Sequence, residues 1–230
     1  MKFKDRLLQG TLIKRYKRFF VDIVFKNKVI TAHCPNSGSM MGLLNSGNTI
    51  YFSESDNPKR KLKYTLEIIK VGENLVGINT FSTNKLVLES LYSKKIKSLT
   101  KFNKIKTEAK FSNNTRFDFL ISNNNEKCFL EVKNVTLLRN RNIAEFPDAI
   151  TSRGTKHLNE LINAKRQGFQ SYMLYLIQRE DCKTFKIAED IDKDYKFAFD
   201  KAIKAGVKIL CYNCMLNNEE VKLKNQIEII

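Results

Sequence analysis

The 230-residue sequence lacks any apolar stretch long enough to cross a bilayer, which takes about 20 residues. Its first six residues, Met1–Arg6, include four charged side chains and lack the long apolar core of a secretory signal. Internal repeats and low-complexity linkers are also missing. These absences predict a cytoplasmic protein that does not work in a membrane.

Cysteines are few, and their spacing does not suggest a disulfide framework. The five cysteines are an odd number and are scattered along the chain, which argues against a set of disulfides. Cys211 and Cys214 have the spacing of a zinc-ligand pair, but a structural zinc site needs two more ligands. Residues 207–216 also have the character of a strand, which would turn the two thiols to opposite faces. We therefore expect no zinc site.

Acidic residues are fewer than basic residues. Asp and Glu number 24 against 41 Lys and Arg, which gives a net charge of +17 and a pI near 9.6. Such a field attracts polyanions, namely DNA, RNA or an acidic membrane face. Because the charge is spread along the chain and not confined to a tail, we favour a nucleic acid over a basic but inert surface.

Residues 1–80 differ in pattern from residues 81–230. The first part has short alternating stretches separated by turn formers, at 10–25, 29–34, 48–53, 64–71 and 75–79. This spacing suggests a small barrel, and an OB-like barrel fits the size and the charge. The second part predicts helices at 84–96, 152–167 and 194–205 and strands at 105–111, 116–122, 128–138, 171–177 and 207–216.

The order helix, three strands, helix, strand is that of the common core of PD-(D/E)xK nucleases. The expected fold is therefore mixed α+β. An OB-like nucleic-acid-binding domain, residues 1–80, precedes an α/β restriction-endonuclease-like domain, residues 81–230.

Three charged residues lie inside apolar strands of the second part. Glu131 and Lys133, two residues apart on one strand, share a face. Asp118 lies on the preceding strand and can face them if the two strands form a hairpin. Charged groups in such strands are costly unless they are paired or bind a metal. Two carboxylates suit Mg²⁺ or Mn²⁺, and a nearby lysine can stabilise charge on a scissile phosphate.

Glu-x-Lys alone is a weak motif in a lysine-rich chain. The alternative is a solvated strand face on which Glu131 and Lys133 form an ordinary pair. Two more acids could complete a metal site, Glu89 in the preceding helix and Glu108 in the first strand, although a solvated position explains each one better. Arg153, Lys156 and His157 fall near the start of a helix, where they could bind phosphate or simply form a basic face.

Longer motifs carry a resemblance to a known family. The chain resembles the sugar fermentation stimulation protein A family over nearly its whole length. The resemblance rests on residues 12–19, 32–40, 55–62, 131–137, 146–149, 153–154 and 156–158. One departure is Ser37, which stands where threonine is expected.

The resemblance implies an OB-like domain, a PD-(D/E)xK-like domain, DNA binding and a regulatory link to sugar (maltose) metabolism. It places metal-site acids at Asp118 and Glu131, with Lys133 beside them. The resemblance also suggests that two N-terminal motifs contact nucleic acid. Their basic residues would bind phosphates, and an aromatic ring would stack on a base. These are Arg15, Tyr16, Lys17, Arg18 and Lys59, Arg60, Lys61. For Tyr16 alone, a place in the core is the favoured interpretation.

Three functions remain open. The chain could be a metal-dependent nuclease acting on single- or double-stranded DNA. It could be a DNA-binding transcriptional regulator that keeps a nuclease fold without turnover. It could also be an RNA-binding accessory protein. The intact Asp118, Glu131 and Lys133 favour the first, because DNA binding alone does not require carboxylates that face a polyanion.

Overall fold

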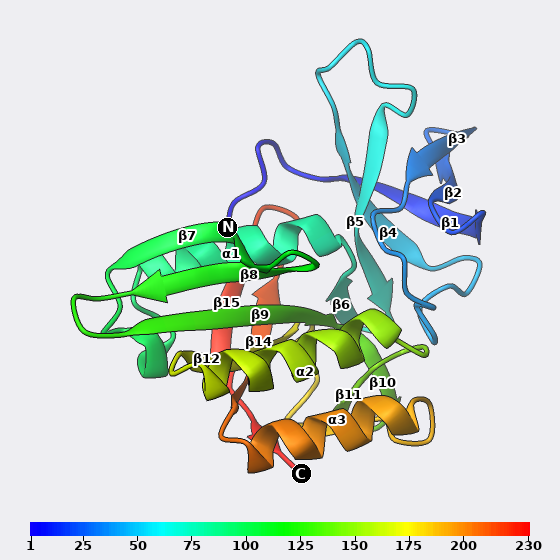
Figure 1. Cartoon of the computed structure of the whole chain (residues 1–230). Helices are drawn as coiled ribbons and strands as arrows, with labels where there is room; N and C mark the ends of the chain where they lie inside the picture. The colour runs from blue at the N-terminus through cyan, green and yellow to red at the C-terminus, as the bar shows by residue number, and fades with distance from the viewer.

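The computed structural model describes residues 1–230 and begins with a barrel (Figure 1). Its strands are β1 (Leu8–Tyr16), β2 (Phe20–Phe25), β3 (Lys28–His33), β4 (Thr49–Glu54), β5 (Tyr64–Val71) and β6 (Asn74–Gly77). They lie in the order β3-β2-β1-β4-β5-β6, and β3 also pairs with β5 through His33 and Thr65. That pairing closes five strands into a barrel around its own core, as the OB-like prediction requires.

The single alternating stretch expected at 10–25 is in fact two strands. Lys17 and Arg18 have backbone φ angles of 44° and 65° and form the turn between β1 and β2. Neither is a glycine or an asparagine, so the sequence carried no turn signal there.

The second domain is built on a six-stranded sheet in the order β15-β14-β12-β9-β8-β7. β7, β8 and β9 form an antiparallel meander, and β12 and β14 run parallel to β9. The strands are β7 (Lys104–Ser112), β8 (Thr115–Ser122), β9 (Lys127–Val135), β12 (Gln170–Ile177), β14 (Lys208–Leu216) and β15 (Val221–Gln226). The order of helix, three strands, helix and strand is thus present, and the predicted fold class is confirmed.

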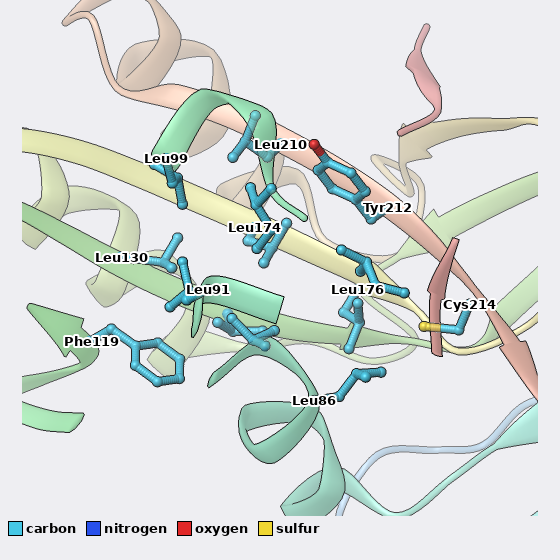
Figure 2. Packing of buried hydrophobic residues seen from close by; sticks show 14 of the residues in the cluster. Leu86, Leu91, Leu99, Phe119, Leu130, Leu174, Leu176, Leu210, Tyr212 and Cys214 are labelled. Carbon is cyan, nitrogen blue, oxygen red and sulfur yellow. The ribbon is translucent and has the colours of Figure 1, made fainter. Parts of the chain in front are cut away.

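Helices cover both faces of this sheet (Figure 1). α1 (Thr80–Tyr92), followed by the short helix η1 (Lys97–Leu99), packs on one face through a cluster of 22 buried residues. Figure 2 shows Leu86 and Leu91 of α1 against Leu130, Leu174 and Leu176 of the sheet. α2 (Ser152–Arg166) and α3 (Lys193–Lys204) pack on the other face through a second cluster. Cys211 and Cys214 fall in different clusters, so they point to opposite faces as predicted.

Two further predicted elements need correction. The helix expected at 84–96 begins four residues earlier, because the side chain of Asn79 accepts a hydrogen bond from the Phe81 amide and caps α1. The strand expected at 128–138 is interrupted at Thr136. Its continuation, β10 (Leu137–Asn140), joins β11 (Ile143–Phe146), β13 (Thr184–Ile187) and β16 (Glu228–Ile229) in a separate four-stranded sheet.

The barrel is joined to the second domain by backbone and side-chain contacts. The amide of Gly77 at the end of β6 donates to the carbonyl of Gln178, which follows β12. A Cβ atom at Gly77 would lie 2.5 Å from the Gln178 side-chain oxygen and 2.9 Å from Leu216, so any other residue here would have to displace these side chains. Ile68 of the barrel also belongs to the core shared by α1 and the sheet. No helix is long and apolar enough to cross a membrane.

Candidate functional site

A cavity of about 470 Å³ lies where the two domains meet. The barrel contributes Asn36, Ser37 and Gly38 of the loop Asn36–Ser39. The C-terminal domain contributes the start of α1, strands β8 and β9, and the segment from β11 to α2. The charged and amide side chains on its wall are Asn36, Asn84, Asp118, Glu131, Lys133, Asn134, Glu145, Asp148, Arg153 and His157. Polar side chains from segments far apart in sequence therefore converge on one cavity.

Glu131 and Lys133 lie side by side on β9, as their spacing predicted. Lys133 Nζ donates to Glu131 Oε1 at 2.7 Å, and the His157 Nδ1 atom contacts the same oxygen. Lys133 Nζ and His157 Nδ1 are 3.1 Å apart. The side chains of Glu131 and Lys133 are 4% and 14% exposed, so this group lies deep in the cavity. Glu131 Oε2 is buried and has no hydrogen-bond partner.

Asp118 lies where β8 separates from β9. The pairing of the two strands stops at Phe119 and Leu130. Beyond that point Asp118 Oδ2 accepts a hydrogen bond from the Val132 amide at 2.7 Å, so the carboxylate takes the place of a strand partner. Asp118 Oδ1 accepts from Asn84 Nδ2, also at 2.7 Å. The separation of the strands therefore places Asp118 beside Glu131 on the cavity wall.

The two carboxylates differ in proton affinity. Burial, together with the negative charge of Glu131, raises the pKa of Asp118 to about 7. Burial also acts to raise the pKa of Glu131, but the Lys133 ammonium and the His157 hydrogen bond outweigh it and lower that pKa below its ordinary value. Glu131 is thus held ionised. A cation bound near Asp118 would favour the ionised form of Asp118 as well.

The donor set fits a divalent cation. Hard oxygen ligands are what Mg²⁺, Mn²⁺ and Ca²⁺ prefer. Asp118 and Glu131 supply two carboxylates on one cavity wall, and Glu131 Oε2 is a buried acceptor without a donor. A third ligand from a side chain is not in place, since no group of three or more His, Cys, Asp and Glu side chains is arranged for a metal.

The structure does not bring the two additional acids to this cavity. Glu89 lies five residues beyond Asn84, about 7.5 Å farther along α1 at 1.5 Å per residue. Its carboxylate contacts the amino group of Met1. Glu108 has an exposed side chain, 3.9 Å from Arg116. The extra contact from α1 is instead made by Asn84, which the sequence did not single out because an amide has no ligand signature.

The residues predicted to bind nucleic acid divide into two groups. Arg153 and His157 line the cavity, and Lys156, on the same helix, donates to the carbonyl of Asn114 at 2.7 Å. Residues outside the cavity are Arg15, Tyr16, Lys17, Arg18, Lys59, Arg60 and Lys61.

Several members of the second group have structural contacts. The Arg15 guanidinium donates to the carbonyls of Asn36 at 2.7 Å and Gly38 at 2.9 Å and so supports the loop that covers the cavity. Tyr16 is half-buried, and its hydroxyl donates to Asp22. Arg60 donates to the Thr65 hydroxyl at 2.8 Å. Lys17, Arg18, Lys59 and Lys61 are exposed.

Comparison with known proteins agrees with this architecture. An OB-like barrel followed by an α/β restriction-endonuclease-like domain defines a class of two-domain proteins. The chain matches the "SfsA N-terminal OB domain" over residues 13–78 and the "Sugar fermentation stimulation protein RE domain" over residues 82–220. The chain belongs to the sugar fermentation stimulation protein family.

Similar relatives include two bacterial sugar fermentation stimulation protein homologues. The one from Pelagibacter ubique is 53% identical over 230 residues, which cover 100% of this chain and 99% of the relative. The one from Caulobacter vibrioides is 42% identical and covers 96% of this chain and 93% of the relative. Among solved structures, Pyrococcus furiosus SfsA in complex with Ca²⁺ has a TM-score of 0.91 at 22% identity and covers 100% and 98% of the two chains. That likeness supports the fold.

Proposed function

We propose that this protein binds DNA and hydrolyses phosphodiester bonds at a divalent-metal site formed by Asp118 and Glu131, with Lys133 beside them. The observation that carries the proposal is the buried oxygen Glu131 Oε2, which has no hydrogen-bond donor. A buried carboxylate oxygen is costly to leave unpartnered, and a bound cation would satisfy it. The Ca²⁺ in the similar Pyrococcus furiosus structure supports a divalent cation as the ligand.

Each side chain then has a chemical role. Asp118 and Glu131 would hold Mg²⁺ or Mn²⁺, which when bound supplies a Lewis acid for the phosphate and lowers the pKa of water. Lys133 carries a positive charge that can stabilise the additional negative charge of the transition state. His157 and Asn84 orient the two carboxylates through their hydrogen bonds. Arg153, at the wall of the same cavity, provides charge for the phosphate backbone.

The competing function is DNA binding without turnover. One observation favours it: Glu131 already has two partners, Lys133 and His157, which offset its charge without a metal. On this alternative, these contacts preserve the fold of a nuclease site that has lost its activity. The third alternative is that the protein binds RNA and not DNA. The 2′-hydroxyl distinguishes RNA from DNA, and no contact in this site indicates a preference for either nucleic acid.

The test is cleavage of labelled single- and double-stranded DNA with Mg²⁺ or Mn²⁺. Asp118→Asn and Lys133→Ala should each lower the cleavage rate by about 100-fold or more, the usual loss for one electrostatic group in an active site. Both variants should keep DNA binding. Glu89→Gln is the matched control, because it removes a carboxylate that lies outside the cavity, and it should cleave normally.

Two other outcomes of this cleavage assay would argue against the proposal. Salt-sensitive binding without cleavage in the native protein would favour the regulator. Cleavage that survives both substitutions would mean that the site lies elsewhere or that a contaminant cuts the DNA.

A further inference from the structure

A second groove, of about 500 Å³, adjoins the candidate site. None of its nine lining residues is hydrophobic and none is acidic. Four are basic, namely Lys110, Arg116, Arg153 and Lys156, and all four side chains are exposed. The nearest acid contact is that of Arg116 with Glu108 at 3.9 Å, and both side chains are more than 60% exposed, so solvent screens it. The groove therefore presents nearly unopposed positive charge.

This groove is continuous with the cavity of Asp118 and Glu131. Arg153 and His157 line both. They lie four residues apart on α2 and so share one face of that helix. The hydrogen bond from Lys156 to the Asn114 carbonyl ties the β7–β8 turn to α2 and fixes the two walls relative to each other. A chain that leaves the cavity past His157 would meet the basic groove directly.

The mouth of the cavity carries two exposed apolar side chains. Phe81 is 69% exposed and Ile150 is 82% exposed, and both line the cavity. Phe81 lies three residues before Asn84 on α1, so the two share a helix face. Asn84 donates to Asp118. An exposed aromatic ring next to a phosphate-binding site is a platform on which an unpaired base can stack.

The size and depth of the cavity favour a single strand. Its volume of about 470 Å³ is in the range that holds a drug-sized ligand, which is the scale of one nucleotide and not of a duplex segment. The target carboxylate of Glu131 is 4% exposed, and Asn36, Ser37 and Gly38 line the cavity from the barrel side. A base-paired backbone cannot bring its phosphate to so deeply buried a carboxylate without being opened, whereas a single strand can.

We infer that a single-stranded nucleic acid stacks a base on Phe81 at the mouth, places a phosphate at Asp118, Glu131 and Lys133, and continues along Lys110, Arg116, Arg153 and Lys156. This inference rests on the proposed function, for which it supplies the substrate class and the path. Lys110 and Arg116 are the new contacts. They come from the β7–β8 hairpin, outside every motif that the sequence analysis singled out.

The experiment measures fluorescence anisotropy of a labelled DNA strand of about 15 nucleotides, within the known site sizes of ~4–16. A duplex of the same length is the comparison, and a chelator prevents cleavage. The double variant Lys110→Ala/Arg116→Ala should weaken binding of the single strand. It should also reduce the slope of log K against log salt concentration by about 1.4, since each phosphate contact contributes ~0.7 for single strands.

Two further variants separate stacking from charge. Phe81→Ala should weaken binding of the single strand about fivefold or more but leave the salt slope unchanged, because no charge is lost. Lys201→Ala/Lys204→Ala removes two exposed charges from α3 that line neither the cavity nor the groove. This control should keep the native salt slope. All the substituted side chains are exposed, so each variant is expected to fold, and thermal unfolding would check this.

The outcomes distinguish this inference from the proposed function. If the native protein binds or cleaves DNA but Lys110→Ala/Arg116→Ala behaves like the α3 control, the path is wrong and the proposed function stands. If the native protein prefers the duplex and Phe81→Ala has no effect, the single-stranded substrate is wrong. If the native protein neither binds nor cleaves any DNA, the proposed function fails and the inference fails with it.

Discussion

At the scale of single residues, Asp118 and Glu131 are the same kind of group in two different environments. Lys133 and His157 hold Glu131 ionised, whereas Asp118 receives hydrogen bonds from Asn84 and the Val132 amide but no salt bridge. The hydrogen bonds to Asp118 do not offset its burial, so its pKa rises to about 7. Pairs of carboxyl groups with separated pKa values are a frequent feature of catalytic sites.

The raised pKa of Asp118 predicts a pH-dependent loss of stability when a chelator is present. The folded protein keeps a proton on Asp118 up to about pH 7, whereas the unfolded chain releases it near the ordinary value of 3.8. The free energy of unfolding should therefore fall as the pH rises from about 4 to about 7, by the order of a few kcal/mol. Glu131 contributes oppositely, but its stabilisation is lost only as the pH falls below its ordinary value of 4.5.

The variant Asp118→Asn isolates this effect. It cannot ionise, and it still offers an oxygen to the Val132 amide. Its melting temperature should exceed that of the native protein above pH 7, and the gap should close toward pH 4. A gap that is constant between pH 4 and 8 would show that Asp118 is ionised throughout this range in the folded protein.

The sequence predicted the positions of the site residues on β9 better than the positions of the site residues around them. The i, i+2 spacing was sufficient to place Glu131 beside Lys133, because strand geometry allows one arrangement. His157 was expected near phosphate and is found on Glu131, a contact that depends on how α2 packs on the sheet. Asn84 could not be predicted, since its role follows from an α1 that begins at Thr80.

At the scale of structural elements, the loop Asn36–Ser39 is held from both domains. Arg15 binds its carbonyls from the barrel side. From the other side, the Ser39 hydroxyl donates to the Asp148 carbonyl at 2.6 Å and the Met40 amide donates to the Asp148 carboxylate at 3.0 Å. A Cβ atom at Gly38 would lie 2.6 Å from that carboxylate. The fit of Gly38 against Asp148 therefore sets the position of the loop over the cavity.

We predict that Gly38→Ala destabilises the protein by about 1–3 kcal/mol, because the added methyl group must displace the Asp148 carboxylate from the Met40 amide. In an Asp148→Ala background the same substitution should cost less, since the obstructing carboxylate is gone. Urea unfolding of the native protein, both single variants and the double variant would give a coupling energy of at least ~0.5 kcal/mol. Asp200→Ala, on the distant helix α3, is the control, and its effect should simply add to that of Gly38→Ala.

Elements were predictable where their pattern was long. α2, α3, β12 and β14 lie within one or two residues of their predicted bounds. The small sheet of β10, β11, β13 and β16 was missed apart from the first two residues of β10, because its strands have two to four residues, too few for a period to show. Part of what fixes this sheet is an ion pair, Arg139 with the buried Glu145, which spacing alone does not reveal.

At the scale of the whole molecule, neighbouring residues of β5 belong to different cores. Ile69 packs in the barrel, whereas Ile68 packs in the core shared by α1 and the large sheet. Leu7, just before β1, joins the same shared core. Apolar side chains of the N-terminal part thus complete the interior of the C-terminal domain.

This arrangement predicts that the protein unfolds in one cooperative transition. Ile68→Ala and Ile69→Ala should each lower the stability by about 2–5 kcal/mol and shift the same transition, whether it is followed by calorimetry or by circular dichroism. Two transitions, of which Ile69→Ala shifts only one, would show instead that the barrel unfolds independently.

The contact between the loop Asn36–Ser39 and Asp148 also limits how these proteins can diverge. The two sides of the contact lie more than 100 residues apart in sequence, so a change on one side must be matched on the other. A chimera that joined this barrel to the C-terminal domain of a distant relative would place a foreign loop over the carboxylates. Recombination that exchanges whole domains should therefore succeed only between parents that agree at Gly38 and Asp148, and the two domains are expected to be inherited together.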